Sequence, residues 1–100
     1  MSKAAVIRYQ TKPEAADENQ RLIEKVFAEL ASAAPSGLRY TSVRLADGVT
    51  FLHVVLGEGD VLPGLAAFTE FQRDFGDRVT TTPERTEATV VGTYSAEVLV

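Results

Sequence analysis

The chain has 100 residues, the size of one small domain, and we expect a single domain over residues 1–100. Its formal net charge of −4 disfavours a nucleic-acid partner, because binding a phosphate backbone needs a concentrated basic surface. The absence of cysteine excludes disulfides, thiolate nucleophiles and thiolate metal sites, and it is typical of the reducing cytoplasm.

The first half of the chain predicts a strand, a helix and a second strand. Residues 1–10 lack an apolar run as long as a signal peptide or membrane span, so we expect a cytoplasmic protein without a membrane partner. A first strand is expected at 4–10, with Val6, Ile7 and Tyr9 as its strand formers. A helix is expected from Pro13, which suits a first helical turn, to the Pro-Ser-Gly run at 35–37. Its i, i+1, i+4, i+5, i+8 spacing gives one apolar stripe of Leu22, Ile23, Val26, Phe27 and Leu30.

A hairpin signal opens the second half. Asp47 and Gly48 predict a tight turn between strands at 38–45 and 49–56, because glycine tolerates the positive φ of such turns. This register sets Val43 opposite Leu52, and Tyr40 opposite Val55. A second helix is expected at 62–78 and a fourth strand at 86–94. The apolar tail at 95–100 either docks on a neighbouring molecule or frays.

The element order is β-α-β-β-α-β, which predicts a ferredoxin-like α+β fold. Right-handed crossovers convert this order into a four-stranded antiparallel sheet with two helices on one face. The strand at 49–56 is apolar on both faces, whereas a half-buried strand alternates apolar with polar residues. Two helices cover only one face of the sheet. We therefore expect a second copy of the chain to cover the other, in a homodimer.

The two faces of the sheet differ in composition. We assign the more uniformly apolar one to the helices: Val43, Leu45, Leu52, Val54 and Leu56. The other face mixes apolar and polar side chains, and we expect it to line a cavity between two sheets: Tyr40, Ser42, Arg44, Phe51, His53 and Val55. Apolar walls with a few inward-pointing polar groups are typical of small-molecule sites, which predicts a small apolar or aromatic ligand.

The element order, the length and the two-sided sheet resemble a dimeric α+β barrel of the antibiotic-biosynthesis-monooxygenase family. The resemblance covers nearly the whole chain and is greatest in the strand Phe51-Leu52-His53-Val54-Val55 and the helix Phe68-Thr69-Glu70-Phe71. It implies two facing sheets and a cavity in each subunit. Some members oxidise aromatic polyketides without metal or flavin, and others degrade haem. These activities use Trp and Asn, whereas this chain has no Trp and its only Asn, Asn19, lies in the first helix.

His53, the sole histidine, is the candidate catalytic residue. As a general base it would take a phenolic or enolic proton, and the resulting carbanion would react with dioxygen. Arg44 would hold the oxyanion, while Tyr40 or Ser42 would orient the substrate. The alternative role for His53 is a hydrogen-bonded wall residue. One histidine without cysteine disfavours zinc, and we expect no metal and no cofactor.

Two other functions compete with a ligand-binding protein or cofactor-independent monooxygenase. The first is a structural or interaction dimer without catalysis. The second is RNA binding, because RNA-recognition domains share this element order. The third strand lacks their basic, glycine-rich signature, and the acidic net charge also disfavours RNA.

Overall fold

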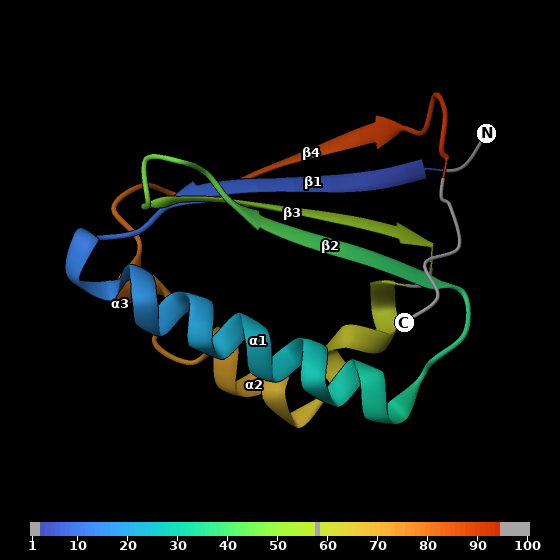
Figure 1. Cartoon of the computed structure of the whole chain (residues 1–100), viewed down its shortest axis with the longest axis horizontal. Coiled ribbons are helices and arrows are strands. Elements are labelled where there is room, and N and C mark those ends of the chain that lie inside the picture. The colour runs from blue at the N-terminus through green and yellow to red at the C-terminus, as the bar shows by residue number, and fades with distance from the viewer. Residues whose placement is uncertain (1–2, 58, 95–100) are drawn as a thin grey trace.

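The computed structural model describes residues 3–57 and 59–94. One antiparallel sheet carries four strands in the order β2-β3-β1-β4, and the helices lie together on one of its faces (Figure 1). The strands are β1 (Lys3–Gln10), β2 (Leu38–Arg44), β3 (Thr50–Gly57) and β4 (Glu84–Thr89). This topology confirms the predicted ferredoxin-like α+β fold. Among the described helices, none is both long and apolar enough to cross a membrane.

The first helix forms much as its sequence pattern predicts. A 3₁₀ turn, η1 (Pro13–Ala15), leads into α1 (Ala16–Ala33). The apolar stripe of α1 faces the sheet, and Leu22 and Val26 are buried there. The helix ends where Ala34 takes a left-handed conformation with φ of 47°, just before the predicted Pro-Ser-Gly run.

The predicted second helix at 62–78 is wrong as a continuous element. Its range holds parts of three short segments: η2 (Gly59–Gly64), α2 (Ala66–Gln72) and α3 (Phe75–Arg78). Pro63 lies inside η2, and Asp74 turns the chain between α2 and α3 with a left-handed φ of 59°. The fourth strand begins two residues earlier than expected and ends at Thr89. The apolar tail at 95–100 lies outside the described residues.

The hairpin has the predicted register, with Val43 opposite Leu52 and Tyr40 opposite Val55. The Asp47 carboxylate fixes the turn by accepting hydrogen bonds from the backbone N–H groups of residues 49 and 50, at 3.0 and 2.9 Å. Because side chains alternate along a strand, this register determines which residues share a face.

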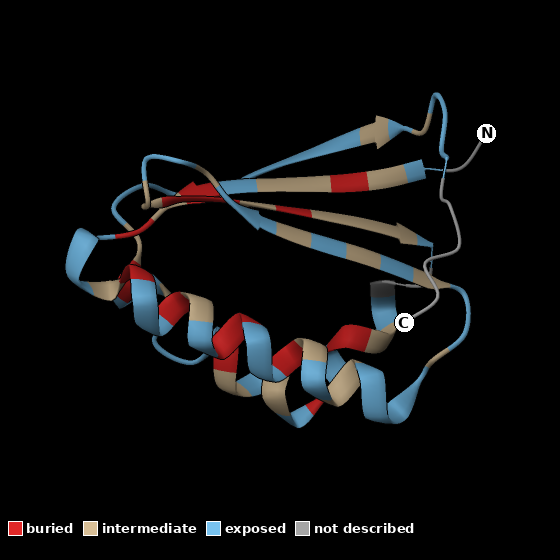
Figure 2. Cartoon of the chain, viewed as in Figure 1, coloured by how far each residue is buried: buried red, intermediate tan, exposed pale blue. Residues whose placement is uncertain are grey.

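The prediction of which face of the sheet the helices cover is wrong. Phe51 and His53, predicted to face a partner's sheet, are 1% and 4% exposed in the single chain, and His53 contacts Phe71 of α2. Buried residues lie along α1 and in β1 and β3 (Figure 2). Val43, predicted to face the helices, is 44% exposed on the opposite side. The described helices therefore cover the face that mixes aromatic and polar groups.

The physical reason is that the helices supply partners for those polar groups. The Arg44 guanidinium donates hydrogen bonds to Asp17 and Gln20 of α1, at 3.0 and 2.8 Å. It also lies 5.6 Å from the centre of the Phe51 ring. Arg44 is itself exposed, so its charge is paired with α1 and also keeps contact with water.

Candidate functional site

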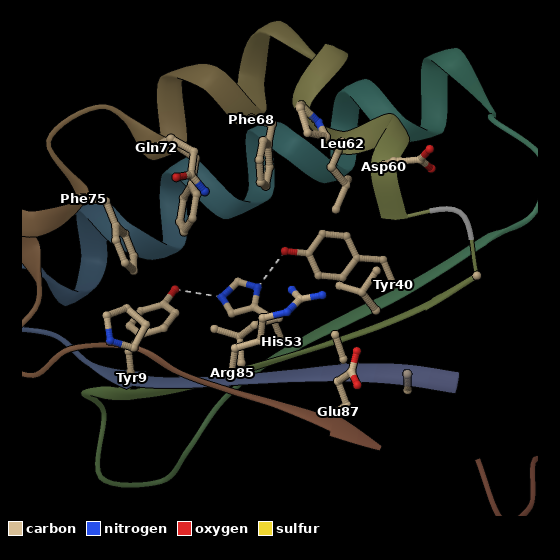
Figure 3. A pocket seen from close by; sticks show the side chains of 18 of the residues that line it. Tyr9, Tyr40, His53, Asp60, Leu62, Phe68, Gln72, Phe75, Arg85 and Glu87 are labelled. Atoms are coloured by element: carbon tan, nitrogen blue, oxygen red, sulfur yellow. Dashed lines mark hydrogen bonds between the residues drawn. The ribbon is translucent and has the colours of Figure 1, made fainter. Parts of the chain in front are cut away.

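A cavity of about 870 Å³ lies between the sheet and the layer formed by η2, α2 and α3. Its volume falls within the usual range of small-molecule sites. Tyr9, Tyr40 and His53 line the sheet side, and Leu62, Phe68 and Phe75 project from the helical side (Figure 3). Phe71 also lines the cavity. Four charged residues also line the cavity: Lys3, Asp60, Arg85 and Glu87.

His53 lies at the base of this cavity with both ring nitrogens engaged. Its Nε2 is 2.7 Å from the Tyr9 hydroxyl, and its Nδ1 is 2.7 Å from the Tyr40 hydroxyl (Figure 3). Burial lowers the pKa of His53 from 6.5 to about 4, because a charged imidazole would lose its hydration there. The ring is therefore neutral at neutral pH.

The two tyrosines are also weak acids in this environment. Burial raises the pKa of Tyr40 to about 12, and burial raises the pKa of Tyr9 further. Both hydroxyls thus keep their hydrogens at neutral pH. Tyr40, His53 and Tyr9 form a neutral, hydrogen-bonded group that provides polar atoms at the base of the cavity, opposite its phenylalanine rings.

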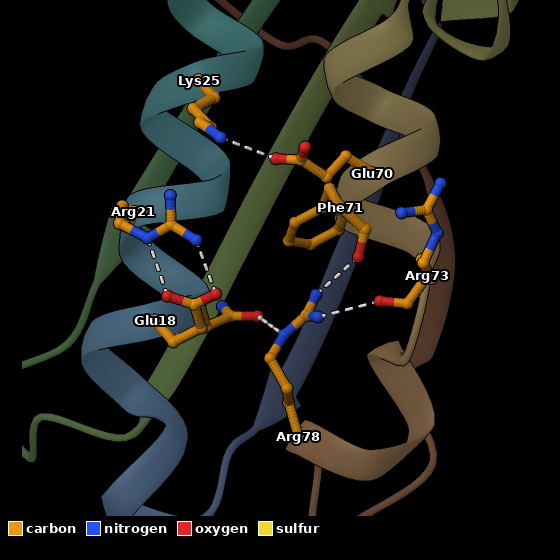
Figure 4. Close-up of polar contacts among 8 residues, drawn as sticks. Glu18, Arg21, Lys25, Glu70, Phe71, Arg73 and Arg78 are labelled. Carbon is orange, nitrogen blue, oxygen red and sulfur yellow. Dashed lines mark hydrogen bonds and ion pairs between the residues drawn. The ribbon is translucent and has the colours of Figure 1, made fainter.

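Behind Tyr9, this group continues into the protein through Asn19 and Arg78. Asn19 Nδ2 donates to the Tyr9 hydroxyl at 2.9 Å, and Arg78 Nε donates to Asn19 Oδ1 at 3.0 Å. Arg78 is held by backbone carbonyls at the end of α2, donating to Phe71 O at 2.6 Å and to Arg73 O at 3.1 Å (Figure 4). Five polar side chains from five elements are therefore connected.

Aromatic contacts hold the cavity walls in place. The Tyr9 ring packs edge-on against Phe75 with ring centres 4.9 Å apart, and the ring centres of Phe71 and Phe75 are 5.4 Å apart. On the other side, the Tyr40 ring contacts Phe27 of α1 at 4.8 Å. Such ring pairs add stabilisation beyond their buried area, so the tyrosine hydroxyls are carried on well-packed rings.

The structure divides the predicted cavity residues into two sets. Tyr40, His53 and Val55 line the cavity, whereas Ser42, Arg44 and Phe51 do not. Phe51 is buried beside Tyr9, with ring centres 5.7 Å apart. The cavity itself lies between the sheet and the helices of one subunit, so its predicted place between two sheets is wrong.

Sequence reasoning missed Tyr9, Asn19 and Arg78 as parts of the site. Asn19 precedes Leu22 by three residues and Ile23 by four, so the helical period already places it on the apolar stripe. A buried amide on such a stripe needs partners, which is a usable signal. The position of Arg78 depends on the helix break at residue 74, and no sequence signal indicates that break. No group of three or more His, Cys, Asp or Glu side chains in residues 3–57 and 59–94 is placed to hold a metal ion.

No protein-family model matches the sequence, and no curated protein matches it. Solved structures do match. Rv0793 from Mycobacterium tuberculosis is 17% identical, with 95% of this chain and 100% of that chain covered and a TM-score of 0.71. A structure of an antibiotic biosynthesis monooxygenase is 16% identical, with 90% and 99% covered and a TM-score of 0.71.

A variant of SnoaB, a cofactor-independent oxygenase from Streptomyces nogalater, is a third match. It is 17% identical, with 92% of this chain and 95% of that chain covered and a TM-score of 0.64. Identities this low show a shared fold alone. At that level, the resemblance to antibiotic-biosynthesis-monooxygenase proteins predicted from the sequence is confirmed.

Proposed function

We propose that this chain, which shares its fold with antibiotic biosynthesis monooxygenases, binds a small aromatic molecule in the cavity around His53. We further propose that it oxidises this molecule with dioxygen and without a bound cofactor. The observation that carries the proposal is the Tyr9–His53–Tyr40 group at the base of an aromatic-walled cavity of about 870 Å³. Flat ligands suit such walls, because aromatic rings pack well against one another.

The chemistry requires only the substrate and dioxygen. A ring CH₂ conjugated with a carbonyl through a fused aromatic ring, as in anthrone, loses a proton to water and gives an enolate, which is electron-rich enough to reduce dioxygen. Oxygen adds at that carbon as a peroxide, and loss of water leaves a new carbonyl. The CH₂ group and O₂ thus become C=O and H₂O, and the substrate supplies all four electrons. The protein's task is to hold the substrate and stabilise the enolate oxygen.

We assign that task to Tyr40, because it lines the cavity and is only half-buried. The predicted role of His53 as general base stays a prediction. Both imidazole nitrogens already contact tyrosine hydroxyls, so neither faces a substrate proton directly. His53 then acts by positioning Tyr40.

Dioxygen consumption tests the oxidation. With anthrone as the substrate, we expect protein-dependent oxygen uptake with one carbonyl formed per O₂, and loss of this uptake in Tyr40→Phe and His53→Gln. Ser32→Ala, an exposed change on α1, is the matched control and should retain full activity. Saturable anthrone binding with no uptake above the protein-free rate would refute the oxidation and leave a binding protein.

We also propose a homodimer, formed through the opposite face of the sheet from the one predicted. Its apolar side chains are covered by no described helix: Val6, Val43, Leu52, Val54 and Leu56. Arg8 and Glu84 are paired in register on this face. The face therefore offers both signs of charge to a two-fold related copy of the chain. An uncovered apolar sheet of this kind typically marks an interface.

Sedimentation equilibrium tests this assembly. We expect a wild-type dimer and a folded monomer for Val54→Lys, because a lysine at the centre of the face would bury an unpaired charge. Ser32→Lys adds the same charge on α1 and should remain dimeric. A wild-type monomer at high concentration, or a dimer that tolerates Val54→Lys, would contradict this interface.

A further inference from the structure

We infer that Arg78 sets the direction of a hydrogen-bond chain that runs through Asn19, Tyr9 and His53 and ends at the cavity. At the cavity end of these hydrogen bonds, Tyr40 presents its own O–H hydrogen to a ligand oxygen. The ligand class is therefore an aromatic molecule with a carbonyl or enolate oxygen. The ligand class rests on the proposed function, whereas the direction of the hydrogen-bond chain does not.

The first step fixes the amide of Asn19. A guanidinium only donates hydrogen bonds, so the Asn19 atom that faces Arg78 Nε at 3.0 Å must be the carbonyl oxygen. The amide NH₂ then faces the Tyr9 hydroxyl at 2.9 Å and donates to it. Arg78 is anchored by two further backbone bonds, to Phe71 O and Arg73 O, so this end of the chain has one orientation (Figure 4).

The second step places the Tyr9 hydrogen. The Tyr9 oxygen accepts a hydrogen bond from Asn19, and Tyr9 is only 2% exposed. Its hydroxyl hydrogen has one acceptor within reach among the described residues, His53 Nε2 at 2.7 Å. Leaving a buried donor unpaired is costly, so Tyr9 donates to Nε2. Nε2 therefore carries no hydrogen.

The third step follows from the neutral state of the imidazole. A neutral ring has one N–H, and with Nε2 unprotonated that hydrogen is on Nδ1. Nδ1 donates to the Tyr40 oxygen, 2.7 Å away. The hydrogen of Tyr40 is then free to point elsewhere, and the residue lines the cavity. Tyr40 is thus a hydrogen-bond donor toward any bound molecule.

A donor at this position selects the chemistry of the ligand. It stabilises a carbonyl oxygen, and it stabilises the same oxygen more strongly once the ligand ionises to an enolate. It forms no such hydrogen bond with an aromatic hydrocarbon, which has no oxygen to accept one. The contact between Tyr40 and Phe27, with ring centres 4.8 Å apart, holds the hydroxyl on one side of the cavity.

The direction of the chain is measurable without any ligand. His53 is the only histidine, so NMR of protein labelled at the imidazole nitrogens reports one ring. We expect Nδ1 to be protonated in the wild type. Asn19→Asp keeps the shape and the contact with Arg78 but offers only acceptors to Tyr9, so it should reverse the chain and protonate Nε2 instead. Protonated Nε2 in the wild type would overturn the direction, as would protonated Nδ1 in Asn19→Asp.

A matched pair of ligands tests the selectivity. Fluorenone and fluorene have the same ring skeleton, and only fluorenone has a carbonyl oxygen. We expect Tyr40→Phe and Asn19→Asp each to weaken fluorenone binding about tenfold, the value of one hydrogen bond, and to leave fluorene binding unchanged. Equal losses for both ligands, or none for fluorenone, would overturn the role of Tyr40. If neither ligand bound the wild type, the proposed function and the ligand class would fall, while the NMR result would still decide the direction.

Discussion

Replacing Phe51 by alanine tests which face of the sheet forms the core of the subunit. Phe51 is 1% exposed and stacks on Tyr9 with ring centres 5.7 Å apart. Truncating a buried phenylalanine costs about 3–5 kcal/mol through lost burial and the cavity left behind. A domain of this size has a free energy of unfolding of about 5–15 kcal/mol. Phe51→Ala should therefore lose a large part of the stability.

The assay is urea unfolding at a low and a high protein concentration. With a denaturant slope of about 1–3 kcal/mol/M, the Phe51→Ala midpoint should fall by roughly 2 M at both concentrations. Leu52→Ala is the matched control on the opposite face of the same strand, and its cost should grow with concentration as dimers form. A Phe51→Ala cost below about 1 kcal/mol in dilute solution, appearing only at high concentration, would refute the reasoning.

Two further predictions concern pH and a close backbone contact. Because burial lowers the pKa of His53 to about 4, the unfolded chain binds a proton more readily than the native one as the pH falls below 6.5. The free energy of unfolding should be highest above pH 6.5 and fall by up to about 3 kcal/mol towards pH 4. Unfolding measured across this pH range should show no such fall in His53→Gln. A wild type without the fall would contradict the burial of His53. A Cβ at Gly57, where φ is +80°, would lie 2.1 Å from Gly37 O, whereas one at Gly76 meets nothing within 4 Å. In thermal unfolding, Gly57→Ala should cost about 1–3 kcal/mol and Gly76→Ala none; equal effects would contradict this contact.

The order of elements and the hairpin register could be predicted because they depend on local signals. Asp47 and Gly48 determine the turn, and the turn determines which residues face one another across β2 and β3. The resemblance to a known fold family followed from the same pattern. These features need only neighbouring residues, so the sequence contains nearly all of the necessary information.

The choice of covered face could not be predicted, because it depends on contacts between distant segments. Counting apolar residues favoured the face of Leu52 and Val54 for the helices. The other face became the core because its polar groups find partners within the chain: the His53 ring contacts two tyrosine hydroxyls, and Asn19 donates to Tyr9. Satisfied polar groups are compatible with burial, and apolar content alone does not reveal them.

The site was predicted in part for the same reason. His53 and Tyr40 were expected on one face, and both line the cavity. Arg78, which orients Asn19, reaches its place only because Asp74 takes a left-handed conformation and starts a new turn of helix. The pattern of phenylalanines at helical spacing predicted a regular helix there, and it contains no signal for this break.

The structure of a complex with fluorenone is the most direct test of where the ligand binds. We predict that the ligand lies between the sheet and α2, with its carbonyl oxygen within hydrogen-bond distance of the Tyr40 hydroxyl. A ligand seated on the other face of the sheet, against Val54 and between two copies of the chain, would contradict the proposed site.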